Sequence, residues 1–223
     1  MKLLRLNYVL GWALVLATLY FIAFKVPPAE KVLGTSYLIF FFHYPSAITC
    51  LLFFVISGIA SALYLIEPSP GKDRAALAAA EIGILGCTIT LVTGSIWAKA
   101  AWGHFWVFED KRLLTVAIMW FVYLGYIALR WSVESPVQRA RFAAVFGVIA
   151  ALTVPLVWYS IRIWGERRHP MSIDLDPEMK FTMRFGAVAF LSLYLAMMST
   201  RMRVARLREE SRRIEELLAQ RDV

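Results

Sequence analysis

The sequence predicts an all-α protein that crosses a membrane six times, with both termini in the cytoplasm. Three observations lead to this prediction. Hydrophobic residues make up 60% of the chain, against ~45–50% in an ordinary soluble domain. Charged residues gather in short blocks, and the apolar runs between them have roughly the 18–25 residues that a helix needs to cross a bilayer. The basic blocks, finally, lie before the first run, between the fourth and fifth runs, and after the sixth. With six spans, all of these segments fall on the same side of the membrane.

Six apolar runs follow one another along the chain. They cover about residues 8–25, 38–66, 77–98, 113–130, 141–161 and 181–199. The first run is longer than the core of a usual signal peptide and lacks a convincing cleavage site, so we expect it to remain as a span. Pro27 and Pro28 are expected to end this first helix, because proline lacks the backbone donor that a continuing helix needs. The second run is long enough to begin with an interfacial turn.

Basic residues set the expected orientation. They precede the first run, flank the connection between the fourth and fifth runs, and fill the segment after the last one (Lys2, Arg5, Arg130, Arg139, Arg141, Arg201, Arg203, Arg206, Arg208, Arg212, Arg213 and Arg221). The positive-inside rule assigns these segments to the cytoplasm. The net charge of +8 is therefore a topology signal, with membrane lipids and not nucleic acid as its partner. The connections at 26–37, 99–112 and 162–180 are then expected outside.

The chain shows no internal repeat or low-complexity linker. We therefore expect one membrane domain over residues 1–200 and a basic amphipathic cytoplasmic tail over residues 201–223. The sequence Pro-Ser-Pro-Gly at 68–71 predicts a tight turn between the second and third spans. In the tail, apolar residues and one serine recur at a helical 3-4-3-4 spacing (Val204, Leu207, Ser211, Ile214 and Leu218). Two interpretations stay open: a solvated extension of the last span, and a docking helix or short coiled coil.

The two cysteines carry no redox signal. Cys50 and Cys87 both lie inside predicted spans, and neither belongs to a C-x-x-C motif. Buried free cysteine usually behaves as a small apolar residue. We expect both to be core residues, which argues against a thiol oxidoreductase or a c-type cytochrome.

An aromatic segment lies between the third and fourth runs. Residues 97–112 read W-A-K-A-A-W-G-H-F-W-V-F-E-D-K-R. Trp102, Phe105 and Trp106 stand at i, i+3 and i+4, which predicts one aromatic face of a short helix, with Phe108 nearby. Such a surface suits a flat, apolar, weakly soluble ligand at a membrane boundary, and haem is the obvious candidate. The alternative is an ordinary belt of interfacial aromatic residues.

All three histidines are predicted at the outer face. His43 begins the second span, His104 lies in the aromatic segment, and His169 lies in the last outer connection. Imidazole is a common axial ligand of haem iron, and six-coordinate haem needs two donors. The alternative roles are a helix cap for His43 and an exposed loop residue for His169. His104 is not expected to bind the iron: it either lies next to the ligands and supports them, or has no role in the site. Cations that could bind the haem propionates are Lys99, Lys111, Arg112, Arg162, Arg167 and Arg168.

Three segments of the chain are similar to known motifs. W-G-H-F-W-V-F-E-D-K, at 102–111, resembles the tryptophan-rich WWD motif of haem-handling proteins. H-Y-P-S-A, at 43–47, and P-L-V-W-Y-S-I-R-I-W-G-E-R-R-H-P, at 155–170, resemble the two histidine segments of the cytochrome c maturation protein C family (CcmC, haem exporter protein C). The resemblance covers about residues 5–200. Phe105 and Phe108 stand where that family usually has tryptophan, and Glu109 where it usually has aspartate.

The resemblance implies a haem transport and chaperone subunit of cytochrome c biogenesis in the bacterial inner membrane, not an enzyme. It implies haem b as cofactor, bound by two axial ligands, an aromatic platform and a motif acid (His43 and His169; Trp102, Phe105, Trp106 and Phe108; Glu109). The implied partners are a CcmE-like periplasmic haem chaperone, a CcmA-like ATPase and a CcmB-like membrane subunit of an ABC transporter, and a small CcmD-like membrane protein. Two rivals remain: a b-type cytochrome that transfers electrons, and a structural transporter subunit that never binds haem.

Overall fold

The computed structural model describes residues 2–26, 34–165 and 175–221, where the regular elements are helices and no strand occurs. These helices are α1 (Lys2–Phe24), the 3-10 helix η1 (Thr35–Ile39), α2 (Phe40–Ile66), α3 (Pro70–Trp102), α4 (Lys111–Ser132), α5 (Pro136–Ala151), α6 (Thr153–Trp164) and α7 (Pro177–Arg221). Six stretches in the described ranges are long and apolar enough to cross a bilayer: Arg5–Phe24, Thr35–Ile66, Pro70–Trp102, Lys111–Ser132, Pro136–Ser160 and Pro177–Gln220. The prediction of an all-α protein with six transmembrane helices is confirmed.

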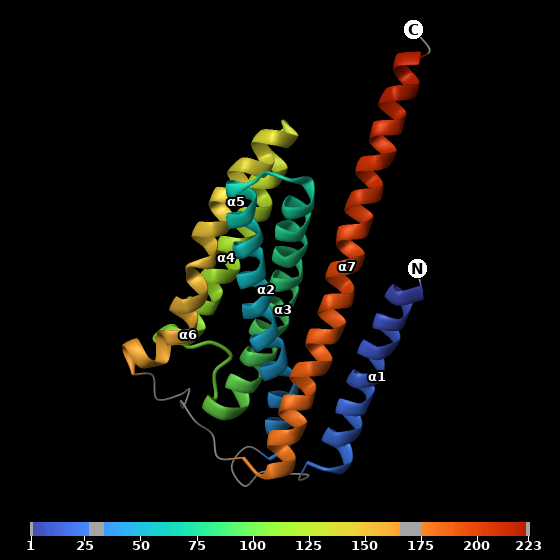
Figure 1. The fold of residues 1–223 in the computed structure, drawn as a ribbon. Helices are drawn as coiled ribbons and strands as arrows, with labels where there is room; N and C mark the ends of the chain where they lie inside the picture. Colours follow the sequence, from blue (N-terminus) through green and yellow to red (C-terminus); the bar gives the residue numbers. More distant parts are fainter. Residues whose placement is uncertain (1, 27–33, 166–174, 222–223) are drawn as a thin grey trace.

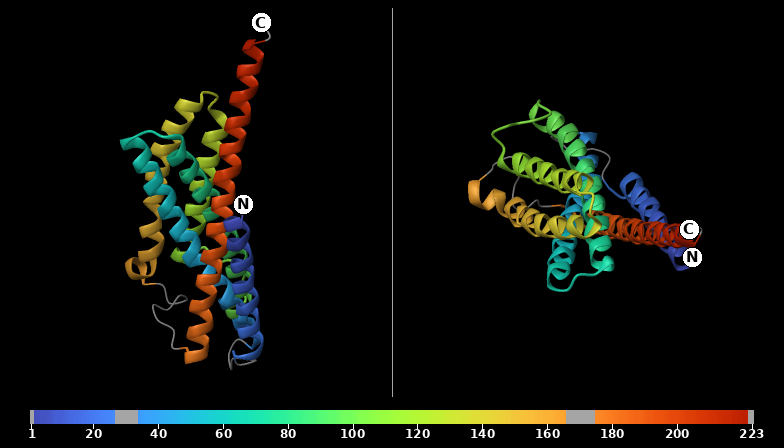
Figure 2. Two further views of the ribbon diagram at one scale, coloured as in Figure 1. Left: turned by 45° about the vertical axis from the view of Figure 1, so that its right-hand side comes forward. Right: turned by 90° about the horizontal axis from the view of Figure 1, so that it is seen from above.

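The helices α2 to α6 form a bundle, α7 lies along one side of it, and α1 packs on α7 (Figures 1 and 2). Figure 1 shows the start of α2, the loop after α3, the end of α6 and the start of α7 at one end, which we call the outer end. The α2–α3 and α4–α5 turns lie at the opposite, inner end, from which α7 projects. The connections that the sequence placed on one side thus share one end of the bundle.

The core lies between α2, α3 and α4. The rings of Phe54 and Tyr123 stack there with their centres 3.8 Å apart. Cys50 and Cys87 belong to the same cluster, are buried, and are free cysteines. The prediction that they are small core residues is confirmed.

The third and the last helix exceed their predicted lengths by the largest margins. The third begins at Pro70 instead of residue 77, with Ser69 as its N-cap, whose Oγ accepts from the Lys72 amide at 3.3 Å. Proline suits this first position because its missing N–H is not needed there. The last helix is continuous over Pro177–Arg221, so the span predicted at 181–199 and the amphipathic tail form one helix. Pro27 and Pro28 lie outside the described residues.

The fifth predicted span, residues 141–161, is confirmed as one stretch long enough to cross a membrane, Pro136–Ser160, but a break divides it. It is divided between α5, which ends at Ala151, and α6, which begins at Thr153. Pro155 explains the break, because it has no N–H to donate to the carbonyl oxygen of Ala151 four residues earlier. The two helices together still cover the length of one span.

Ion pairs join α3 to its neighbours near the inner end. The guanidinium of Arg130, on α4, donates to both carboxylate oxygens of Asp73, at 2.6 and 2.8 Å. Arg201, on α7, donates to Oε1 of Glu81 at 2.9 Å. Glu81 is the acidic residue that lies furthest into the third span, and this ion pair joins it to α7.

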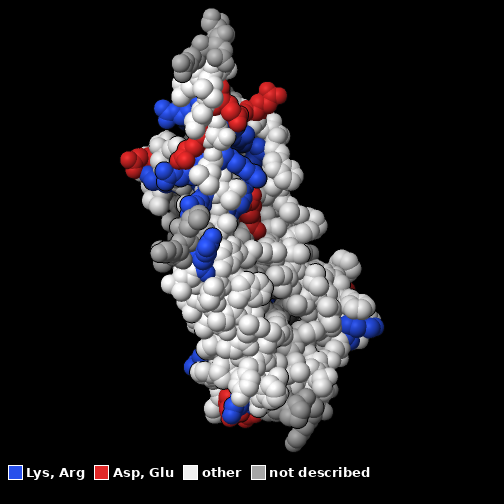
Figure 3. Space-filling model, turned by 90° about the vertical axis from the view of Figure 1, so that its right-hand side faces the viewer, with Lys and Arg blue, Asp and Glu red and all other residues white. Residues whose placement is uncertain are grey.

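The helix α1 is held mainly by α7. Its Phe21 ring meets the rings of Phe181 and Phe185 edge-on, each with centres 5.2 Å apart, but only 11% of its span is buried. Figure 3 shows a broad band without charged residues over the face of the molecule that carries these two helices. A surface of this kind is expected to face lipid.

Candidate functional site

His43 lies in the first turns of α2, and its imidazole faces α3. Its Nδ1 is 3.1 Å from Oγ1 of Thr93. The Thr93 hydroxyl donates to the carbonyl oxygen of Ile89 at 2.7 Å, so its oxygen is available to accept from Nδ1–H. This hydrogen bond favours the tautomer with the proton on Nδ1. The second nitrogen, Nε2, then carries the lone pair that a metal ligand needs.

Gly94 allows the imidazole to lie directly against the backbone of α3. A Cβ atom at Gly94 would stand 2.9 Å from Cε1 of His43 and 3.4 Å from its Nδ1. A larger residue would therefore displace the ring from Thr93. Sequence reasoning missed both Thr93 and Gly94, since nothing in their local sequence marks them as neighbours of His43.

The aromatic segment is not the short helix that its spacing predicted. The helix α3 ends at Trp102, and Gly103 follows in the left-handed conformation with a φ of 78°. The Gly103 amide donates to the carbonyl oxygen of Lys99 at 3.1 Å. Glycine commonly ends helices in this way, because it adopts a positive φ without strain. Residues 103–110 therefore form a loop, which we call the aromatic loop, and Trp102, Phe105 and Trp106 do not share a helix face.

Large rings of the aromatic loop remain open to the surroundings. Phe105 and Phe108 are 59% and 75% exposed, while Trp106 in the loop and Trp102 at the end of α3 are half-buried. The Trp106 and Phe108 rings meet edge-on with centres 6.4 Å apart, and Nζ of Lys99 lies 5.6 Å from the centre of the Phe105 ring. Exposed apolar rings gathered in one loop mark an interaction surface.

An acidic residue that the sequence analysis left unassigned fixes the end of this loop. Asp110 is fully buried and caps α4, and its Oδ1 accepts from the amides of Arg112 and Leu113 at 2.9 and 3.1 Å. Asp at the N-cap before an apolar run is a recognisable signal in sequence. Glu109, the predicted motif acid, is exposed in the preceding turn. Asp110 therefore shapes the loop, and Glu109 is left facing outward.

Those predicted propionate-binding cations that the structure describes lie at the outer end. Lys111 is exposed and Arg112 half-buried at the start of α4. Arg162 is exposed near the end of α6, with its guanidinium carbon 5.5 Å from the centre of the Tyr159 ring.

The remaining predicted residues divide into two groups. His104 is exposed in the aromatic loop. Arg167, Arg168 and His169 lie outside the described residues, so the pairing of His43 with His169 stays a prediction.

Known proteins are similar to the chain over most of its length. The family model for Heme exporter protein C (CcmC) matches residues 2–216. Heme exporter protein C of Escherichia coli strain K12 is 31% identical over 233 aligned residues, which cover 97% of this chain and 94% of that protein. The protein of the same name from Bradyrhizobium diazoefficiens is 32% identical over 200 residues, which cover 87% of this chain and 76% of that protein. The one from Paracoccus denitrificans is 31% identical over 171 residues, which cover 76% of this chain and 69% of that protein. The chain therefore belongs to the CcmC, or Heme exporter protein C, family.

Proposed function

We propose that the chain binds haem at the outer end of its bundle, in the bacterial inner membrane, and presents it to a periplasmic haem chaperone during cytochrome c maturation. Membership of the Heme exporter protein C family supports a role in haem handling. The observation that carries the proposal is the setting of His43, whose hydrogen bond to Thr93 favours the tautomer with Nε2 as the ligand nitrogen. Trp102 follows Thr93 along the same helix, about 13 Å further at ~1.5 Å per residue.

In this proposal each group of residues contacts a different part of haem b. His43 and His169 are the axial ligands, and Trp102, Phe105, Trp106 and Phe108 contact the macrocycle. Lys111, Arg112, Arg162, Arg167 and Arg168 are candidate contacts for the propionates, because fixed cations attract carboxylates at a membrane boundary. When haem is bound, the imidazoles of His43 and His169 would hold its iron.

The exposure of the aromatic loop favours transfer over storage. Phe108 is 75% exposed, so a macrocycle held against it keeps one edge accessible to a partner. A haem enclosed among the spans would have no such route to a second protein. The proposed recipient is a CcmE-like chaperone, with CcmA-like and CcmB-like transporter subunits driving release and a CcmD-like protein bound alongside.

The rival function of electron transfer is less well supported. A b-type cytochrome that carries electrons across a membrane needs ligands at more than one depth in facing helices. Of the two histidines in the described ranges, only His43 lies in a helix, and it stands at the outer end. A redox titration with a quinol would separate the two functions, because the haem chaperone should not be reduced at a catalytic rate.

Removing the hydrogen bond to His43 should weaken haem binding. Thr93→Val keeps the shape of the side chain, and we expect haem affinity to fall about tenfold, since partners of a ligand histidine are worth ~10–100-fold in affinity. The measurement is a haem titration followed by Soret absorbance. Thr18→Val is the matched control, because the buried Thr18 hydroxyl donates to Leu14 of its own helix. Equal affinities of the two variants would refute the role of Thr93.

Removing two rings of the platform should lower haem retention without unfolding the bundle. Aromatic contacts are worth about 1 kcal/mol per ring, so Trp102→Ala with Trp106→Ala should weaken haem binding roughly 30-fold. The readout is haem retained per protein after purification. Trp12→Ala with Trp131→Ala removes two rings that are 55% and 84% exposed elsewhere on the bundle, and should change retention little. Unchanged occupancy in the platform variant would show that the loop does not contact haem.

A further inference from the structure

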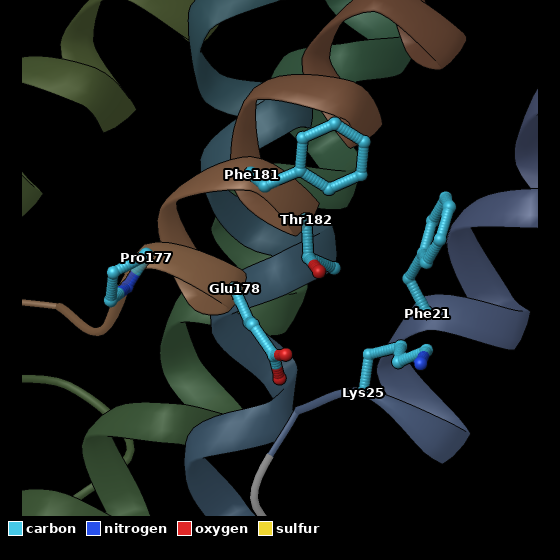
Figure 4. Close-up of a pocket in the computed structure, with 6 residues that line it drawn as sticks. All are labelled: Phe21, Lys25, Pro177, Glu178, Phe181 and Thr182. Carbon is cyan, nitrogen blue, oxygen red and sulfur yellow. The ribbon is translucent and has the colours of Figure 1, made fainter.

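A cavity of about 320 Å³ opens between the outer ends of α1 and α7. Figure 4 shows the residues that line it: Phe21, Lys25, Pro177, Glu178, Phe181 and Thr182. It lies on the α1 side of the molecule, whereas His43 faces α3 from α2. The haem site proposed above makes no use of this cavity.

Thr182 places a buried hydroxyl at the wall of the cavity. The residue is 1% exposed, and its Oγ1 has no hydrogen-bond partner among the residues that the structure describes. Threonines elsewhere on these helices satisfy their hydroxyls on the backbone, as Thr18 does on Leu14 and Thr200 on Ala196. Figure 4 shows the Thr182 side chain pointing into the gap between α7 and α1. A buried hydroxyl without a partner is destabilising, so it favours a ligand that brings an acceptor oxygen.

Two side chains of opposite charge flank the same gap. Lys25 follows the last turn of α1, Glu178 lies in the first turn of α7, and both are exposed. Figure 4 shows their charged groups apart, one from each helix. A ligand that carries both a negative and a positive group would complement this pair.

The rest of the lining is apolar and continues along the face of α1. Phe181 is 52% exposed and meets Phe21 with ring centres 5.2 Å apart. The span of α1 is only 11% buried. Acyl chains lying against this face would hold a head group at the level of the cavity.

We propose that this cavity binds the head group of phosphatidylethanolamine from the outer leaflet. Lys25 binds the phosphate, Glu178 accepts hydrogen bonds from the ammonium group, and Thr182 donates to an ester or phosphate oxygen. The acyl chains pack on Phe21 and Phe181. The bound lipid fills the gap between the two helices and gives the Thr182 hydroxyl its partner.

The test is lipid retention by the full chain in mild detergent, measured by native mass spectrometry after exposure to equal amounts of phosphatidylethanolamine and phosphatidylglycerol. The native chain should retain several-fold more phosphatidylethanolamine. Glu178→Gln should abolish this preference, because the glutamine has no charge for the ammonium group. Lys25→Gln should lower the retention of phosphatidylethanolamine about tenfold. Thr182→Val should lower it severalfold, and Thr182→Ser, which keeps the hydroxyl, should retain the lipid as the native chain does.

Arg184→Gln is the matched control, since Arg184 is an exposed cation in the second turn of α7 that does not line the cavity. It should retain both lipids as the native chain does. Equal retention of the two lipids by the native chain, or losses in Arg184→Gln as large as those in Lys25→Gln, would overturn the proposal and leave only unspecific annular lipid. Unchanged retention in Thr182→Val would also overturn it, because water would then be the partner of the hydroxyl.

Discussion

Alanine at both His43 and His169 is expected to abolish stable haem binding. Six-coordinate haem needs two axial donors, and without them the macrocycle is held only by aromatic contacts and by the cations near its propionates. Each single variant should keep a weaker, five-coordinate haem with a shifted Soret band. The measurement is the optical spectrum of the purified protein after expression with excess haem.

His104→Ala is the control for this prediction. His104 is exposed in the aromatic loop and is not expected to bind the iron, so its loss should change the Soret band little. Two results would refute the ligand assignment: loss of the Soret band in His104→Ala alone, or an unchanged band in the double variant.

The spans could be predicted from sequence because the bilayer imposes one length on all of them. A run of about 20 apolar residues between charged blocks has few other solutions. Breaks inside a span were harder to predict. Pro45 lies inside α2 without ending it, whereas Pro155 stands where α5 gives way to α6. Both residues are prolines in apolar runs, so the presence of a proline in the sequence does not by itself tell a continued helix from a broken one.

In the candidate site, the features that neighbouring residues determine could be predicted from the sequence, and those that depend on distant residues could not. Gly103 and Asp110 act through the backbone beside them, as a helix end and an N-cap, so their signals were present in the sequence. The helical spacing of Trp102, Phe105 and Trp106 was misleading, because the glycine between them ends the helix. Thr93 and Gly94 could not be found locally. They stand about 50 residues from His43, and their role arises only from the register in which α2 packs on α3.

Asp73→Ala is expected to cause the largest loss of stability in this chain. Arg130 is only 8% exposed and donates to both oxygens of Asp73. Removing the carboxylate leaves the guanidinium buried without its counter-charge, which costs about 3–5 kcal/mol. The measurement is thermal unfolding of the purified protein in detergent, where the midpoint should fall well below that of the native chain.

A paired replacement distinguishes a lost counter-charge from lost packing. Asp73→Leu with Arg130→Met removes both charges and keeps apolar volume, so it should recover most of the stability that Asp73→Ala loses. Lys72→Gln is the control, because it breaks the neighbouring pair with Glu67, whose side chain is 83% exposed, and should change the midpoint little. A midpoint for Asp73→Ala equal to that of Lys72→Gln would contradict the prediction. Because this pair lies at the inner end and His43 at the outer end, folded protein of the paired variant should still bind haem with native affinity.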